Sequence, residues 1–305
     1  MKNILVLIDN SVNSEHLALS AMNIALTIRA NITLAHASKK DNSGNNHDLE
    51  NYESNLHEEQ ILSGIADYLR TVVQAARKAD FMPAVKCLLY PGTVVDLLAE
   101  TTNDHAIDLV LIGSHQPRSW EKVMFRTRMN DILDHIGCPL MVIPRKFIID
   151  QIAHAIFAVD LSIDYHKALH YFVIFSACFE TKVAVINISR LGFPEKHSEL
   201  DLCELVNSCL DKNLPPVTYH TVRSAQVRSG LLAALESKKV DLLCLVHKNY
   251  GFLRRMFHVS ISKQLADNVL IPIMILPDDY SVAPVFLPGD QNVMTSATND
   301  NFSLG

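Results

Sequence analysis

Residues 138–144 read Cys-Pro-Leu-Met-Val-Ile-Pro, and residues 271–277 read Ile-Pro-Ile-Met-Ile-Leu-Pro, 133 positions further along the chain. Each stretch is a short, solid apolar run next to proline. Runs of this kind are typical of strands that are buried on both faces of a parallel sheet. Their recurrence indicates that the chain contains two copies of one folding unit.

Two further landmarks recur in the same order. One apolar run ends in Asp9, and its counterpart ends in Asp160, 151 positions later. Another run begins directly after Asp108, and its counterpart follows Asp241, again 133 positions later. The two offsets differ by 18 residues, and we assign most of this difference to the polar segment Ser38–Ser54, which we interpret as a loop.

Short apolar runs alternate with longer amphipathic stretches along the whole chain, which is the pattern of successive βαβ units. The expected strands are Ile4–Ile8, Ile32–Ala37, Val85–Leu89, Leu109–Ile112, Leu140–Ile143, Ala155–Val159, Val183–Ile188, Val217–Val222, Leu242–Val246 and Ile271–Leu276. The sequence therefore predicts an α/β protein with two domains, 1–147 and 148–277. The polar segment 278–305 has no periodicity, and we expect it to be extended or disordered.

Helices are visible between the strands. An apolar stripe at helical spacing runs from Ile61 to Ala76. Thr93 is placed to cap a short helix that extends through Glu100. Thr127 and Ser260 are expected to begin the helices that precede the last strand of each copy.

Composition limits the function classes. The net charge of −6 argues against broad binding to nucleic acid or to anionic membranes, because both need a basic face. Six cysteines occur without a Cys-x-x-Cys pair, and no uncharged apolar stretch is long enough to span a bilayer. We expect a cytoplasmic protein with reduced, buried cysteines, no nucleic-acid partner and no membrane partner.

The repeated landmarks resemble the universal stress protein family over residues 1–277. The resemblance implies two tandem Rossmann-like αβα domains of three layers, each with a five-stranded parallel sheet of strand order 3-2-1-4-5. In this order the topological switch point lies between strands one and four. Ligands of open α/β sheets bind at such a point. ATP-binding members carry Gly-x-x-Gly, nine residues and Gly-Ser/Thr after strand four, because glycine allows close backbone approach to phosphate and helix N-termini bind anions.

The first copy keeps this spacing but only part of the motif. Gly113 and Thr127 match the family, whereas Gln116 and Arg126 replace glycines. Side chains of the basic residues around Thr127 offer a substitute for backbone contacts to an anion, and a solvated basic loop is the alternative interpretation. The candidate residues for a nucleotide or anion site, with ATP or another adenine nucleotide as the implied ligand, are Asp9, Asn10, Ser11, His36, Gly113, Ser114, His115, Gln116, Arg126, Thr127 and Arg128.

The second copy has lost every glycine of the motif, and only Ser260 matches. Valine at two of these positions obstructs phosphate and resists a positive φ. The degenerate second site therefore comprises Asp160, Ser162, Val246, His247, Asn249 and Ser260.

Two other sequence features have both a structural and a functional interpretation. His166 and His170 have a zinc-ligand spacing but no evident third ligand, so we expect a surface pair and no metal. The segment Ala168–Phe179 is apolar nearly all the way around, so its second face must meet the other domain, another subunit or an apolar ligand.

The sequence lacks Gly-x-Ser-x-Gly, Walker and dinucleotide-binding motifs, so we expect no enzyme. The resemblance implies a stress-response or regulatory binding protein. It also implies an intramolecular pseudo-dimer that joins the two strand-five edges, and a homodimer of chains stays open. Two alternative functions remain: ATP binding through the first domain alone, and transport of an apolar small molecule in the second.

Overall fold

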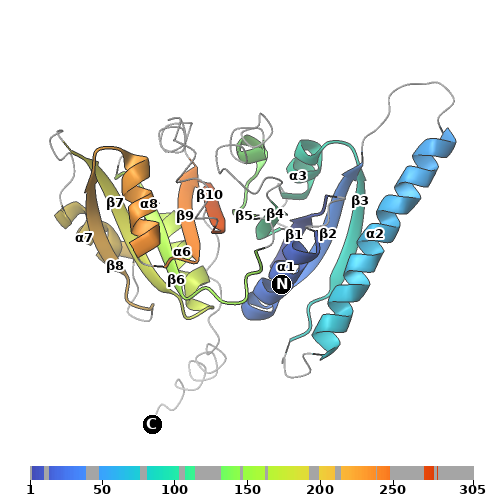
Figure 1. Ribbon diagram of the computed structural model, residues 1–305, viewed down its shortest axis with the longest axis horizontal. Helices are drawn as coiled ribbons and strands as arrows, with labels where there is room; N and C mark the ends of the chain where they lie inside the picture. Colours follow the sequence, from blue (N-terminus) through green and yellow to red (C-terminus); the bar gives the residue numbers. More distant parts are fainter. Residues whose placement is uncertain are drawn as a thin grey trace, which may run out of the picture.

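The structure is a computed structural model, and it describes residues 2–9, 14–38, 48–75, 81–102, 107–113, 132–144, 147–161, 164–191, 199–209, 214–237, 239–247, 271–277 and 280. Strands and helices alternate along both halves of the chain (Figure 1). The first half contains β1 (Lys2–Leu7), α1 (Ser14–Ile28), β2 (Ala30–Ser38), α2 (Asp48–Ala75), β3 (Val85–Pro91), α3 (Val94–Thr102), β4 (Leu109–Gly113) and β5 (Leu140–Ile143). The second half contains β6 (His154–Val159), α6 (His166–Ala177), β7 (Lys182–Arg190), α7 (Glu199–Cys209), β8 (Thr218–Ser224), α8 (Val227–Ser237), β9 (Leu242–His247) and β10 (Ile273–Pro277).

All ten strands form one sheet in the order β3-β2-β1-β4-β5-β10-β9-β6-β7-β8. Within each half the pairs are parallel and the order is 3-2-1-4-5, which confirms the predicted fold class. The halves meet where β5 pairs antiparallel with β10 (Figure 1). Met141 lies opposite Met274 at the centre of this pairing. All expected strands are present, with ends shifted by at most two residues.

Burial follows position in the sheet. Central strands are buried on both faces; for example, Ile4, Leu5 and Val6 of β1 are all 0% exposed. The outer strands β3 and β8 are only partly covered. The expectation that all cysteines are buried is therefore wrong for Cys87, which lies exposed on the edge strand β3.

The repeated aspartates Asp108 and Asp241 have a structural role at the opposite edge from the candidate sites. Asp108 Oδ2 accepts a hydrogen bond of 2.8 Å from the main-chain N–H of Asn3, at the start of β1. Asp241 Oδ2 accepts bonds of 2.9 Å from the N–H groups of Ala153 and His154, at the start of β6. Each carboxylate thus fixes the first strand of its half to the fourth.

Helix α2 accounts for most of the length difference between the two halves. It has 28 residues and begins at Asp48, whereas its counterpart α7 has 11. Interpreting Ser38–Ser54 as a loop was therefore wrong at both ends, because Ser38 belongs to β2 and residues 48–54 are helical. The extra residues lengthen a helix instead of extending a loop.

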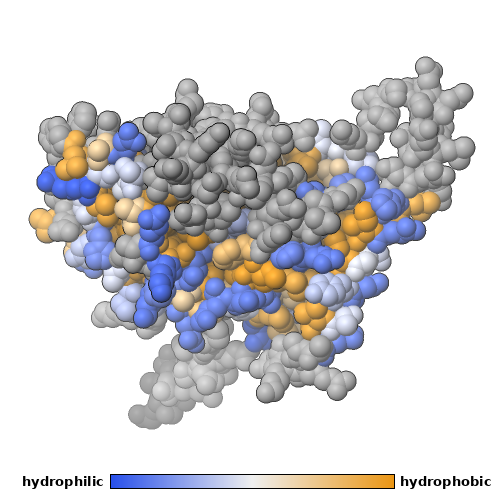
Figure 2. Space-filling model, in the orientation of Figure 1, coloured by the Kyte–Doolittle hydropathy of each residue, from blue (hydrophilic) through white to orange (hydrophobic). Residues whose placement is uncertain are grey.

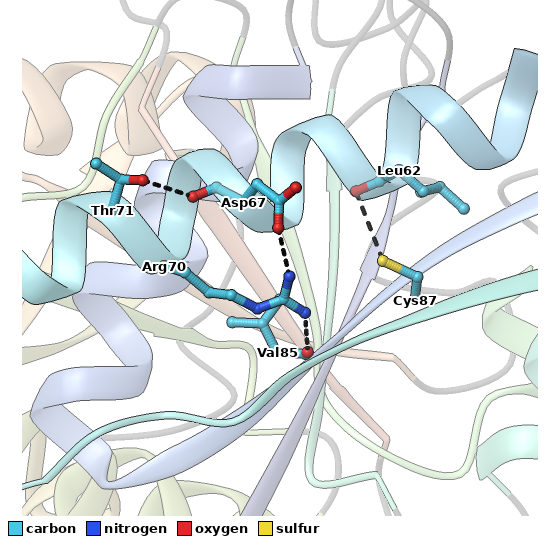
Figure 3. A network of polar contacts seen from close by, with 6 residues as sticks. All are labelled: Leu62, Asp67, Arg70, Thr71, Val85 and Cys87. Atoms are coloured by element: carbon cyan, nitrogen blue, oxygen red, sulfur yellow. Dashed lines mark hydrogen bonds and ion pairs between the residues drawn. The ribbon is translucent and has the colours of Figure 1, made fainter.

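Polar contacts attach α2 to the edge strand β3 (Figure 3). The Arg70 guanidinium donates to Asp67 Oδ1 at 2.6 Å and to the carbonyl of Val85 at 3.1 Å. The thiol of Cys87 donates to the carbonyl of Leu62 at 3.5 Å. Figure 2 shows apolar residues among hydrophilic ones along α2, where Leu56 is 39% exposed.

Helix α3 begins as predicted and ends two residues later than expected, at Thr102. The Thr93 hydroxyl oxygen accepts a 3.2 Å bond from the N–H of Asp96. In return, Asp96 Oδ2 accepts bonds from the Thr93 hydroxyl and N–H. This reciprocal pair is a capping box with aspartate at the third helical position.

Helix α6 is buried on more than one face, and part of its second face contacts Tyr280. Its buried side chains are Ala168, Leu169, Tyr171, Phe172, Val173, Ile174, Phe175 and Ser176. The Tyr171 ring packs edge-on against Tyr280 at 5.2 Å, and burial raises the pKa of Tyr171 well above its usual value. Asp108 and Cys138 of the first half act on the pKa of Tyr171 in the same direction, so the two halves are close here.

Tyr280 belongs to the segment expected to be an extended or disordered tail, yet it is only 8% exposed. That expectation does not hold at this residue. Residues 278–279 and 281–305 lie outside the described part of the chain.

Candidate functional site: two unlike crevices at the strand ends

The first candidate site lies where β1 and β4 end side by side. Leu7 pairs with Ile112, which places Asp9 next to Gly113 at the carboxyl edge of the sheet. The N–H of Ile8 donates to the carbonyl of Ala35 at 2.8 Å, so the end of β2 is fixed at the same edge. The structure therefore brings the predicted residues Asp9, His36 and Gly113 together.

Asp9 is contacted by the first residue of α1. The Ser14 hydroxyl donates to the main-chain carbonyl of Asp9 and lies 3.2 Å from its carboxylate Oδ1. Ser14 is 4% exposed, whereas Asp9 is partly exposed. A small side chain thus holds the turn after β1.

His36 connects three elements at this edge. Its Nδ1–H donates to the carbonyl of Ile8 at 2.7 Å, because a carbonyl only accepts. Its Nε2 lies 3.5 Å from Glu58 Oε1 on α2, and both side chains are 14% exposed. The other Glu58 oxygen, Oε2, is buried without a hydrogen-bond partner in the structure. His36 therefore has a structural role, tying α2 and β2 to the end of β1.

A Cβ added to Gly113 would meet one neighbour among the described residues, the Leu17 Cδ2 atom, at 3.7 Å. This is an ordinary van der Waals distance, so these residues leave room for the added carbon. The remaining first-site candidates lie outside the described residues: Asn10, Ser11, Ser114, His115, Gln116, Arg126, Thr127 and Arg128.

The second crevice is built differently around its acid. The Tyr165 hydroxyl donates to Asp160 Oδ1 at 2.7 Å and accepts from the N–H of Asp160 at 3.2 Å. Its ring is 2% exposed and packs edge-on against Phe157, with 6.1 Å between the ring centroids. The following residue, Leu161, has φ of 52°, a left-handed conformation that costs an L-residue about 1–2 kcal/mol.

The first motif residue of the second copy belongs to a strand. Val246 is 3% exposed and pairs with Leu276 inside the sheet. The next residue, His247, faces the first half, with its Nε2 3.4 Å from Asp134 Oδ1. Both positions therefore serve packing and contact between the halves. Ser162, Asn249 and Ser260 lie outside the described residues.

Sequence reasoning missed the residues that distinguish the two crevices. Ser14 and Tyr165 are separated by the same 151 positions as Asp9 and Asp160, so they are equivalent in the repeat. Extending the alignment by five residues past each aspartate would have exposed the exchange of serine for tyrosine. Glu58 offered no comparable signal, because it is one acidic residue of several on α2.

No group of three or more His, Cys, Asp or Glu side chains in the described part of the chain is arranged to hold a metal ion. His166 contacts Asp164 and Ser208. Among the described residues, no helix combines the length and the apolar character needed to cross a membrane.

These features define a duplicated Rossmann-like α/β protein in which the two equivalent strand-end acids, Asp9 and Asp160, have unlike surroundings. Residues 1–144 match the model of the Universal stress protein family. The first half of the chain is thus a domain of that family, and the second half repeats the same fold.

Solved structures share the whole tandem arrangement. A universal stress protein from Archaeoglobus fulgidus DSM 4304 is 16% identical, with a TM-score of 0.64 over 90% of this chain and 96% of that one. A functionally unknown protein from Pseudomonas aeruginosa PAO1 is 11% identical, with a TM-score of 0.53 over 92% and 93% of the two chains. At these identities the likeness supports the fold alone. No curated protein sequence matches the chain.

Proposed function

We propose that this chain is a non-enzymatic, cytoplasmic regulatory protein of the stress response with one working crevice. The crevice of the first half binds an anion or an adenine nucleotide such as ATP, in a weakened or altered form of the family's mode. The second half does not bind nucleotide, and it serves assembly and regulation.

The observation that carries this proposal is the unlike surroundings of the two equivalent acids. Asp9 is contacted by a small serine, and beside it the described residues leave room for a Cβ on Gly113. In the second half, the Tyr165 hydroxyl donates a hydrogen bond to the Asp160 carboxylate. Val246 stands at the position of the first glycine of the family motif and is buried in the core. A ligand hydroxyl would have to displace Tyr165 before it could bind Asp160.

The second half has a clear structural role that supports this division. Pairing of β5 with β10 extends one sheet through both halves, so the chain provides internally the edge contact that we infer for a pseudo-dimer. The connection between the halves is also fixed to α1. Asn23 Nδ2 donates to the carbonyl of Ile149 at 2.9 Å, and the N–H of Ile149 donates to the Ser20 hydroxyl at 3.0 Å.

Thermal unfolding with and without ATP and magnesium tests the proposal. A ligand present at ten times its Kd stabilises a protein by about 1.4 kcal/mol, which raises the Tm by roughly 3–5 °C for a domain of this size. We expect such a rise for the natural chain and for the matched control Asp160→Ala, but not for Asp9→Ala. No shift in the natural chain at millimolar ATP, or an equal loss in both variants, would contradict the proposal.

A further inference from the structure

Three polar side chains outside both crevices form a continuous hydrogen-bonded chain. Asp164 precedes α6, His166 is its first residue, and Ser208 lies in the last turn of α7. Asp164 Oδ1 lies 2.5 Å from His166 Nδ1, and His166 Nε2 lies 2.7 Å from the Ser208 hydroxyl oxygen. This is the order of groups that activates a serine hydroxyl through a histidine.

The protons can be assigned from the partners. Bonds from the main-chain N–H and the ring of His166 lower the pKa of the Asp164 carboxyl, so it stays ionised and accepts from Nδ1–H. In the neutral ring Nε2 is then the acceptor, and it faces the Ser208 hydroxyl. The single hydroxyl proton has two acceptors, since the carbonyl of Leu205 is 2.8 Å from the same oxygen.

The two helix ends act on the charges of these residues. Asp164 is at the N-terminus of α6, where the helix dipole stabilises its anion. The last turn of α7, which contains Ser208, favours a cation on the adjacent imidazole, whereas the N-terminus of α6, where His166 lies, opposes it. Asp164, His166 and Ser208 are all exposed, so a reagent in solution can reach the hydroxyl.

We propose that Ser208 is an activated nucleophile that accepts an acyl group from an activated ester or thioester. The Ser208 oxygen forms a bond to the acyl carbon while the bond from that carbon to the leaving oxygen or sulfur breaks. The hydroxyl proton moves to His166 Nε2 and from there to the leaving group. Asp164 positions the ring and stabilises its charge. This proposal is independent of the function proposed above.

Acylation of the full chain with p-nitrophenyl acetate, followed by peptide mass spectrometry, tests it. Ser229 is the internal reference, because it is an exposed serine whose hydroxyl contacts Ser224 and the carbonyl of Gln226 and no histidine among the described residues. General-base assistance contributes about 10²–10⁴-fold, so we expect Ser208 to be acetylated at least about 100-fold faster than Ser229.

Variants separate activation from simple exposure. His166→Asn should bring the rate at Ser208 close to that at Ser229. Asp164→Asn should reduce the rate at Ser208 by a smaller factor, because the asparagine side-chain oxygen can still accept a hydrogen bond from the ring Nδ1–H of His166. Far-UV circular dichroism should be unchanged in both. Equal labelling of Ser208 and Ser229, or labelling of Ser208 that His166→Asn leaves unchanged, would overturn the proposal.

Discussion

The Tyr165 hydroxyl donates a 2.7 Å hydrogen bond to the Asp160 carboxylate, while the residue equivalent to Tyr165 in the first half is Ser14. One exchange within a duplicated framework thus gives the two strand-end acids different surroundings. The buried Tyr165 ring packs against Phe157 and its hydroxyl makes two hydrogen bonds with Asp160, whereas the smaller Ser14 contacts Asp9 through its hydroxyl alone.

Removing only the hydroxyl should measure how strongly the second crevice is closed. Tyr165→Phe deletes two hydrogen bonds to Asp160 and leaves the ring packed against Phe157. We expect a loss of about 1–3 kcal/mol in the free energy of unfolding in urea, because a partly buried carboxylate loses its partner. Tyr68→Phe on the surface of α2, where Tyr68 is 44% exposed, is the matched control and should change stability by less than about 0.5 kcal/mol. Equal effects at the two positions would show that the bond does not stabilise the fold.

Gly113→Ala should separate ligand binding from folding. Among the described residues the added Cβ meets nothing closer than 3.7 Å, so we expect stability to change by less than about 0.5 kcal/mol, while ATP-dependent stabilisation is lost. Gly230→Ala is the contrasting variant, because its Cβ would lie 2.8 Å from Ser224 Cβ and 2.9 Å from Ile188 Cγ2. It should cost about 1–3 kcal/mol through overpacking, measured in the same urea titrations. A Gly113→Ala variant that binds ATP unchanged would contradict the close approach.

The duplicated aspartates at the opposite edge allow a comparison within one molecule. Asp241 accepts two main-chain bonds at the start of β6, whereas Asp108 accepts one at the start of β1. A bond to a charged acceptor contributes about 1.5–3 kcal/mol, so Asp241→Ala should destabilise more than Asp108→Ala. Differential scanning calorimetry of both variants tests the order. The reverse order would mean that these main-chain hydrogen bonds do not dominate the contribution of Asp108 and Asp241 to stability.

The capping box of α3 should make stability depend on acid pH. Bonds from the Thr93 hydroxyl and N–H lower the pKa of Asp96 below its ordinary value of 3.8. The carboxylate therefore stabilises the folded state above the unfolded pKa, and this contribution is lost as the pH falls through the lower folded pKa. Asp96→Asn should flatten the decline in Tm below about pH 4 relative to the natural chain. Parallel pH profiles for the two proteins would refute this.

The sequence predicted the strands well because each is a short apolar run between polar segments. Their order came from the resemblance of Asp9, Asp108 and residues 138–144 to a known family, since periodicity alone carries no information on strand neighbours. The beginning of α2 was missed because residues 48–54 are polar and lack the apolar stripe that starts at Ile61. Helical turns without an apolar stripe resemble loops in a single sequence.

The candidate sites were only partly predictable. Asp9, His36 and Gly113 lie at one edge of the sheet, because residues at the ends of parallel strands meet there, and their role in binding stays a prediction. The hydrogen bond between Tyr165 and Asp160 depends on the direction of the Tyr165 ring, which only the three-dimensional structure shows. The contact between His166 and Ser208 spans 42 residues and depends on how α6 packs against α7, so sequence spacing gave no hint of it.

Equilibrium dialysis with radiolabelled ATP and magnesium tests the central asymmetry most directly, because it counts nucleotides per chain. We predict one bound nucleotide per chain, lost in Asp9→Ala and retained in Asp160→Ala. Two nucleotides per chain, or binding that disappears only when Asp160 is replaced, would contradict this account.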